Sequence, residues 1–222
     1  MIYDAHIHNK NLEAGGFLIG LEGIPKFNES VLSNAEAMAF HSPEQHYIAF
    51  YYVTYSECNN VIPSHKYLKY HPKREKYTPI QVIESIRENT PKCVILDTLN
   101  EPYWQPNDYW HVARQFPDIP VILAHAGGYS INEFVKICHL QHNVWIDFSL
   151  TQKTLGCYGD SERGLPYIDQ AIRYALQSPF KNRILLSSDY PFFSQEEAFQ
   201  YYSKYITQLN ENFLALFDRI IM

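Results

Sequence analysis

Residues 120–140 have the sequence Pro-Val-Ile-Leu-Ala-His-Ala-Gly-Gly-Tyr-Ser-Ile-Asn-Glu-Phe-Val-Lys-Ile-Cys-His-Leu. The first six, Pro120–His125, form an apolar run of strand length, and Gly127-Gly128 separates them from a helical pattern over Asn132–Leu140. An almost continuously apolar strand followed by a helix is typical of a parallel sheet that helices cover. The stretch therefore predicts one strand–helix unit of an α/β fold.

The same alternation continues in both directions along the chain. We expect strands at residues 2–8, 16–20, 47–55, 67–71, 94–98, 120–125, 144–149 and 183–188. We expect helices at residues 33–40, 79–89, 107–115, 132–140, 165–177, 195–207 and 211–217. Eight strands with intervening helices predict a compact (β/α)8 TIM barrel. Because the second strand is weak, an incomplete or distorted barrel is the alternative. Because no linker divides the 222 residues, we expect a single domain over residues 1–222.

Composition limits the classes of partner. The net charge is −6 and no basic run is longer than Lys73-Arg74, so we expect no nucleic-acid partner. No apolar run is long enough to cross a membrane, and the four cysteines form no CxxC pair, which is typical of reduced thiols. With ligand-type residues starting at position 4, we expect no signal peptide, a cytoplasmic location and a small-molecule substrate.

The first nine residues, Met1-Ile-Tyr-Asp-Ala-His-Ile-His-Asn9, place Asp4, His6 and His8 at every second position of a short apolar strand. Side chains alternate between the faces of a strand, so we expect these three on one face. Zinc and related metals favour paired imidazoles, and a nearby carboxylate either completes or orients the set. The pattern predicts half of a metal site.

Ionisable residues also stand at or just after the ends of most other expected strands. They are Lys69, His71, Asp97, His125, Asp147 and Asp189. The active site of a parallel α/β barrel gathers at the carboxyl ends of its strands. We therefore expect these side chains to meet in one small area, although a buried Asp147 satisfied by backbone donors is an equal alternative.

Four motifs in order resemble the amidohydrolase superfamily, and more closely its amidohydrolase-related branch, which holds the aminocarboxymuconate-semialdehyde and resorcylate decarboxylases. The motifs are Asp-Ala-His-Ile-His (4–8), Lys-Tyr-His-Pro (69–72), Ile-Leu-Ala-His-Ala-Gly-Gly (122–128) and Ser-Ser-Asp-Tyr-Pro (187–191). Residues 210–217 resemble the closing helix of the family. The resemblance covers nearly the whole chain.

This resemblance implies a barrel that holds one divalent metal, usually zinc. His6 and His8 match the first-strand ligands, and Asp189 matches the carboxylate that binds the metal and takes a proton from the attacking water. His125 matches the histidine beside the metal-bound water or the substrate. Because family members are often dimers, the resemblance also implies a possible homodimer.

The chain departs from the family at the fifth strand, where Asp97 stands in place of the usual ligand histidine. Asp97 either binds the metal, orients His6 or His8, or does neither. A metal set of His6, His8, Asp189 and Asp97 is richer in oxygen, so manganese or iron becomes an alternative to zinc.

Three further residues are substrate-binding candidates. Lys69 and His71 share a strand face, and they either hold a substrate anion or are a helix-facing or solvated pair. Glu101 lies in a loop at the same end of the expected barrel.

These features predict a metal-dependent hydrolase of a small carbonyl substrate, namely a lactone, a cyclic amide or an ester. The alternatives are a non-oxidative decarboxylase on the same metal site, a metal-dependent deoxyribonuclease, and a degenerate barrel that binds without turnover. Without the fifth-strand histidine, the last of these stays open.

Overall fold

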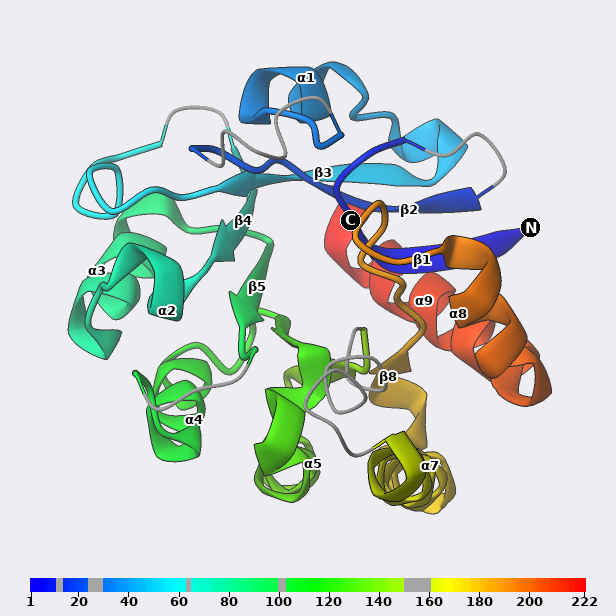
Figure 1. Cartoon of the computed structure of the whole chain (residues 1–222). Coiled ribbons are helices and arrows are strands. Elements are labelled where there is room, and N and C mark those ends of the chain that lie inside the picture. The colour runs from blue at the N-terminus through cyan, green and yellow to red at the C-terminus, as the bar shows by residue number, and fades with distance from the viewer. Residues whose placement is uncertain (11–13, 24–29, 63–64, 100–102, 150–160) are drawn as a thin grey trace.

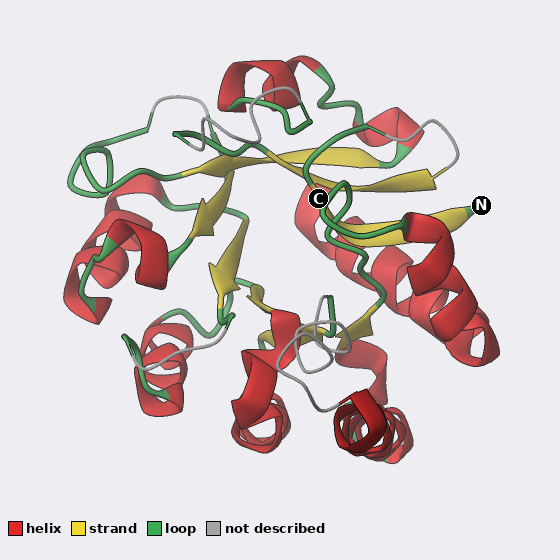
Figure 2. Ribbon diagram, in the orientation of Figure 1, coloured by secondary structure: helices red, strands yellow, loops and turns green. Residues whose placement is uncertain are grey.

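Eight parallel strands form one sheet in sequential order around the molecule (Figures 1 and 2). The computed structural model describes residues 1–10, 14–23, 30–62, 65–99, 103–149 and 161–222. The strands are β1 Ile2–Ile7, β2 Ala14–Ile19, β3 Tyr47–Tyr52, β4 Tyr67–Tyr70, β5 Cys93–Asp97, β6 Val121–Ala124, β7 Val144–Asp147 and β8 Ile184–Leu185. The doubtful second strand is present and pairs with both of its neighbours.

The sheet closes between β8 and β1 through backbone hydrogen bonds from the segment that follows the short β8. The amide of Ala5 donates to Leu186 O at 2.8 Å, and the amide of Asp189 donates to His6 O at 2.8 Å. These bonds join the last strand to the first, and the predicted (β/α)8 barrel is confirmed.

Helices surround the ring of strands (Figure 1). They are α1 Asn34–Ala39, α2 Pro72–Glu75, α3 Pro79–Asn89, α4 Pro106–Gln115, α5 Ile131–Leu140, α7 Ser161–Gln177, α8 Gln195–Tyr201 and α9 Ile206–Ile221. Among the described residues, no α-helix separates β1 from β2 or β3 from β4, which explains how so short a chain completes the barrel. None of the helices in the described ranges is long and apolar enough to cross a bilayer.

Two apolar layers hold the barrel. Outward-facing strand residues such as Leu68 and Val94 pack against the helices in the larger core. Inward-facing residues such as Phe17, Phe50 and Ile95 fill the barrel interior, where Phe213 of α9 joins them. Because apolar side chains and α9 fill this interior, the polar residues at the carboxyl ends of the strands are left to form a site at the other end.

The C-terminal helices differ from the prediction. A single α9 spans residues 206–221, whereas the sequence predicted a break before residue 211. The side-chain amides of Asn210 and Asn212, which lie inside this continuous helix, make tertiary hydrogen bonds. Asn212 Nδ2 donates to Ile184 O at 2.7 Å, and Asn210 Oδ1 accepts from the amide of Tyr3 at 3.1 Å.

The turn after β6 depends on Gly127, which has a φ of +75°. A Cβ at this position would lie 2.0 Å from Cδ2 of Phe134, so neither the backbone nor the space accepts a side chain. We expect Gly127→Ala to lower the free energy of unfolding by about 2–4 kcal/mol, from backbone strain plus overpacking. Urea denaturation checks this, with the exposed Gly23→Ala (φ +68°) as a control for backbone strain without the ring clash.

Candidate metal centre and active site

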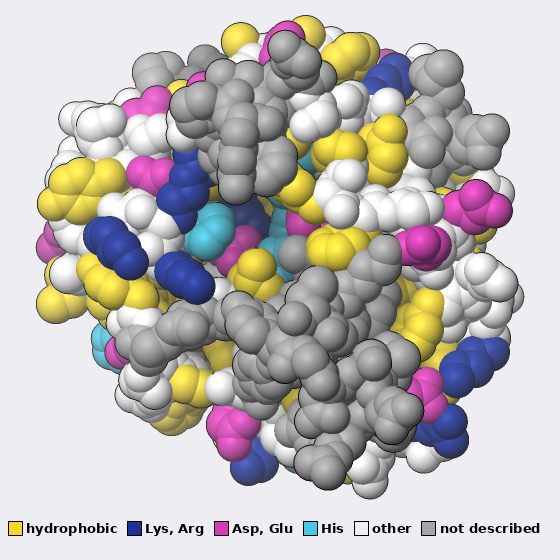
Figure 3. Space-filling model, viewed as in Figure 1, with side chains coloured by type: hydrophobic (Ala, Val, Ile, Leu, Met, Phe, Trp, Pro, Cys, Tyr) yellow, Lys and Arg dark blue, Asp and Glu magenta, His cyan; other side chains and the backbone are white. Residues whose placement is uncertain are grey.

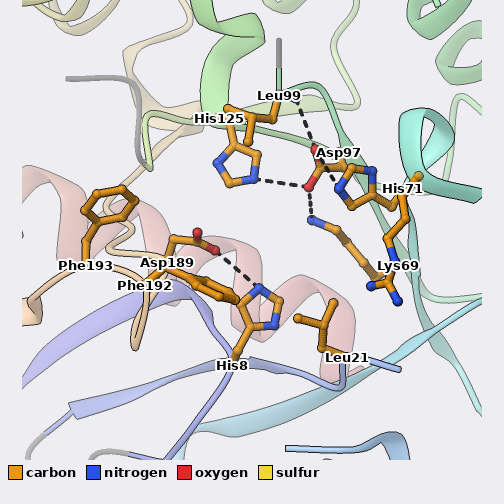
Figure 4. Close-up of a pocket in the computed structure, with 11 residues that line it drawn as sticks. His8, Leu21, Lys69, His71, Asp97, Leu99, His125, Asp189, Phe192 and Phe193 are labelled. Carbon is orange, nitrogen blue, oxygen red and sulfur yellow. Dashed lines mark hydrogen bonds and ion pairs between the residues drawn. The ribbon is translucent and has the colours of Figure 1, made fainter. Parts of the chain in front are cut away.

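A cavity of about 310 Å³ opens at the carboxyl ends of the strands. Figure 3 shows the hollow on this face, with histidine, acidic and basic side chains inside it. Its lining residues are His8, Leu21, Lys69, His71, Arg74, Asp97, Leu99, His125, Asp189, Phe192 and Phe193. The structure thus brings together most of the side chains predicted from the strand ends (Figure 4).

His6, His8 and Asp189 form one of two clusters of metal-ligand type among the described residues. Asp189 Oδ1 lies 3.2 Å from His6 Nε2 and 3.2 Å from His8 Nε2. All three side chains are buried. Strand β1 supplies His6, and His8 directly follows the strand. The backbone bond from Asp189 to His6 O places the carboxylate beside them.

The second nitrogen of each imidazole faces a hydrogen-bond acceptor. His8 Nδ1 donates to Ile19 O at 3.0 Å, and His6 Nδ1 lies 3.4 Å from Asp147 Oδ2. Such contacts turn the Nε2 lone pair toward a metal, as they do for most metal-ligating histidines. Burial, followed by the charge of Lys69, lowers the pKa of His6 to about 4 and favours the neutral ring that metals bind.

This donor set fits one divalent cation. Ligand atoms at about 2.0–2.2 Å from a tetrahedral ion lie roughly 3.3–3.6 Å apart, close to the separations seen here. Three protein ligands with one open position are typical of catalytic sites, whereas structural sites use four. His6, His8 and Asp189 are therefore the residues that would hold the ion.

Asp147 belongs to a second cluster, with His6 and His125. Its Oδ1 accepts hydrogen bonds from the amides of His125 and Ser149 at 3.0 Å each and from Ser149 Oγ at 2.6 Å. These donors occupy one carboxylate oxygen while the other faces His6. Both alternatives for Asp147 therefore hold: its side chain points inward, and backbone amides satisfy its carboxylate. Asp147 also orients His6.

Asp97 lies in the cavity wall but belongs to neither cluster of metal-ligand spacing in the described residues. Its Oδ2 accepts from Lys69 Nζ at 2.9 Å and lies 3.1 Å from His125 Nε2. Burial opposes its ionisation, but the charges of His71, Lys69 and His125 outweigh burial and hold the pKa of Asp97 well below its usual range. Direct ligation by Asp97, one of the three alternatives that the sequence left open, would require Oδ2 to leave these partners.

His125 is held by hydrogen-bond partners on both ring nitrogens. Nε2 faces Asp97, and Nδ1 lies 3.0 Å from Ser149 O. Burial opposes its protonation, but the Asp97 carboxylate outweighs burial and raises the pKa of His125 to about 9. The ring therefore carries two N–H donors and a fixed orientation at the cavity wall.

Backbone strain coincides with these two candidate catalytic residues. His125 has a φ of +66° and Asp189 a φ of +63°, in the left-handed region that non-glycine residues rarely adopt. Strain of this kind costs roughly 1–3 kcal/mol and tends to occur at functional sites. It supports a functional role for both positions.

The other predicted positions have mixed outcomes. Lys69 and His71 both line the cavity, as the inward alternative required, and Lys69 is fully buried. Glu101 lies outside the described residues. Asp4 does not join the histidines: its carboxylate accepts from Ser188 Oγ at 2.5 Å and from Gln195 Nε2 at 2.8 Å.

The position of Asp4 has a structural cause. The register of β1 against β2 shifts between Asp4 and Ile7, so the strict alternation assumed from the sequence fails there. Burial raises the pKa of Asp4 to about 6, and the carboxyl group ties β1 to the segment after β8.

Sequence reasoning missed the apolar and basic parts of the cavity wall. Leu21, Leu99, Phe192 and Phe193 follow strands in loops, and Arg74 lies in the short α2. Their positions after strands β2, β5, β8 and β4 were the only available signal. That signal does not separate a cavity residue from a surface residue.

Solved structures share this fold. A TIM-barrel protein from Bordetella bronchiseptica has a TM-score of 0.66 and 16% identity, with 94% of this chain and 79% of that chain covered. A probable 2-pyrone-4,6-dicarboxylic acid hydrolase from Acinetobacter baumannii, with citric acid bound, has a TM-score of 0.62 and 14% identity, covering 98% and 99%. An amidohydrolase from Burkholderia multivorans with bound zinc has a TM-score of 0.58 and 13% identity, covering 90% and 81%.

Sequence comparison gives the family. No curated protein matches the sequence. The profile of a family described as amidohydrolase matches residues 79–208, more than half of the chain, and this range includes His125 and Asp189. The chain therefore belongs to the amidohydrolase family, and this match supports an enzyme of the hydrolase class.

Proposed function

We propose that this protein hydrolyses a C–O or C–N bond of a small carbonyl compound, namely a lactone, a cyclic amide or an ester. The position of Asp189 carries the proposal, because its Oδ1 lies 3.2 Å from Nε2 of both His6 and His8 at the cavity wall. Zinc is the ion that we expect there, since two imidazoles and one carboxylate suit it; manganese and iron are alternatives.

The ion, when bound, polarises a carbonyl group and lowers the pKa of water to about 7. Asp189 is the general base in this proposal and accepts a proton from the attacking water. The water oxygen forms the new bond to the carbonyl carbon. Asp189 then returns the proton to the departing oxygen or nitrogen as the C–O or C–N bond breaks.

His125 has a positioning and polarising role in the proposal. Asp97 and Ser149 fix its ring through contacts of 3.1 and 3.0 Å. The fixed, protonated ring beside a reacting carbonyl stabilises through its positive charge the negative charge that develops on the carbonyl oxygen. The apolar side chains of the cavity exclude water from the rest of the substrate, which strengthens that interaction.

The cavity volume favours a small-molecule substrate over a polymer. At about 310 Å³ it is near the lower limit for ligand pockets. The partners in this proposal are accordingly small carbonyl compounds. A homodimer is a separate proposal, which a measurement of the oligomeric state tests.

Decarboxylation is the second candidate, favoured by one observation: Lys69 reaches the cavity. A cation there would bind a carboxylate substrate. The ammonium, however, already donates to Asp97 Oδ2 at 2.9 Å, which leaves hydrolysis as the preferred function.

Product analysis separates the two reactions. The zinc-loaded protein is incubated with a lactone (dihydrocoumarin), a cyclic amide (dihydrouracil), an ester (4-nitrophenyl acetate) and an aromatic acid (2,6-dihydroxybenzoate). We expect ring opening or ester cleavage that incorporates one oxygen atom from ¹⁸O-labelled water. Release of CO2 from the acid without hydrolysis of the others would establish a decarboxylase, and turnover of none would favour the non-catalytic barrel.

A further inference from the structure

The cavity has a basic side chain that the proposed reaction does not use. Arg74 of α2 lines it, three residues after His71. Figure 4 shows His71 on the side of the cavity across from Asp189. Arg74 Nη1 and His71 Nδ1 are both buried and have no hydrogen-bond partner. A buried donor without a partner is costly, so Arg74 Nη1 is a position where a ligand atom would be stabilising.

The guanidinium of Arg74 is held in place from several sides. It lies over the ring of Tyr52, with Cζ 4.9 Å from the ring centroid. Its Nε lies 3.5 Å from Glu75 Oε1. A Cβ on Gly23 would be 3.2 Å from its Nη2, so the backbone after β2 lies close to the guanidinium. A braced guanidinium loses little entropy when it binds an anion.

Glu75 does not neutralise the far end of the guanidinium. Its Oε1 also accepts from the hydroxyl of Tyr52 at 2.7 Å, and its Oε2 accepts from the amide of Tyr55 at 2.8 Å. These bonds hold Glu75 on the Nε side of Arg74. The Nη1 side is the one without a partner.

Other charged side chains of the cavity wall already contact partners within the protein. Lys69 donates to Asp97, and Asp189 faces His6 and His8. Among the described lining residues, Arg74 is therefore the cation that no carboxylate of the cavity wall engages. Its planar fork of N–H groups matches a carboxylate.

We propose that Arg74 binds a carboxylate of the substrate. This inference rests on the proposed hydrolysis and narrows it to lactones, cyclic amides or esters that carry one carboxylate, with an apolar body between that group and the reacting carbonyl. Leu21, Leu99 and Phe192 supply the apolar wall. A single cation without a carboxylate partner in the cavity wall selects one anionic group and disfavours a second.

A matched pair of probes tests the subsite without any need for turnover. Benzoate and benzamide have the same shape and differ in charge. We expect isothermal titration calorimetry on the zinc-loaded protein to give a dissociation constant at least about tenfold lower for benzoate. Arg74→Met should raise the dissociation constant of benzoate by about tenfold or more and change that of benzamide by less than about twofold.

Arg87→Met is the matched control, because Arg87 is exposed on α3 and the variant has the same change in net charge. It should leave both constants unchanged. Equal binding of the two probes by the wild type, absence of benzoate binding, or equal constants for Arg74→Met and Arg87→Met would overturn the subsite.

The outcomes for subsite and reaction are separable. Loss of benzoate binding in Arg74→Met together with no hydrolysis of any substrate would retain the subsite and reject the proposed function. Hydrolysis of uncharged dihydrocoumarin as fast as its carboxylated analogue, in both wild type and Arg74→Met, would retain the function and reject the subsite.

Discussion

Asp189→Asn is expected to lower kcat for hydrolysis by about a thousandfold while most of the bound metal is retained. The amide keeps the shape of the carboxylate and one oxygen to face His6 and His8, but it does not accept the proton of the attacking water. Steady-state kinetics on the best substrate, with metal content measured on the same samples, check both parts.

The matched control for this variant is Asp118→Asn, since Asp118 is exposed and does not line the cavity. It should retain wild-type kcat. An Asp189→Asn enzyme with an unimpaired rate would remove Asp189 as the base. Loss of metal in step with activity would show that Asp189 acts only as a ligand.

The double change His6→Ala with His8→Ala is expected to reduce bound zinc from about one equivalent to less than about a tenth. Two of the three donors are lost, and the remaining carboxylate is a weak site on its own. The barrel should stay folded, because its strands pair through their backbones and the apolar interior is unchanged. Elemental analysis after dialysis measures the metal, and circular dichroism follows the fold.

The control with the same composition change is His111→Ala with His142→Ala, two exposed histidines outside the site. It should bind zinc as the wild type does. Stoichiometric zinc in the His6/His8 variant would show that the ion is held elsewhere, with the cluster of His125 and Asp147 as the first place to look.

Much of the fold follows from local sequence. Apolar runs of strand length alternate with helical segments, and the predicted helix over Pro79–Asn89 has the observed bounds. A capping box at Thr78 fixes its start, which is a signal carried by adjacent residues. Because parallel strands bring their carboxyl ends together, the meeting of His8, Asp97 and Asp189 also follows from the order of elements.

The rest depends on contacts between distant residues. The sequence pattern of β1 did not reveal the register shift that places the Asp4 carboxylate in hydrogen-bonding contact with Ser188. The Lys69–Asp97 bond joins two strands, and its geometry depends on side-chain packing inside the barrel. The role of Asn212 could not be predicted from its neighbours in sequence, because its partners, the carbonyls of Lys181 and Ile184, are about thirty residues away.

The position of one bound ion tests the proposed site most directly. An anomalous difference map, recorded at the zinc edge from crystals grown with zinc, should show one peak bonded to Nε2 of His6, Nε2 of His8 and a carboxylate oxygen of Asp189, with Asp97 still on Lys69. A peak bonded to Asp97, or one between His125 and Asp147, would contradict this assignment of the metal ligands.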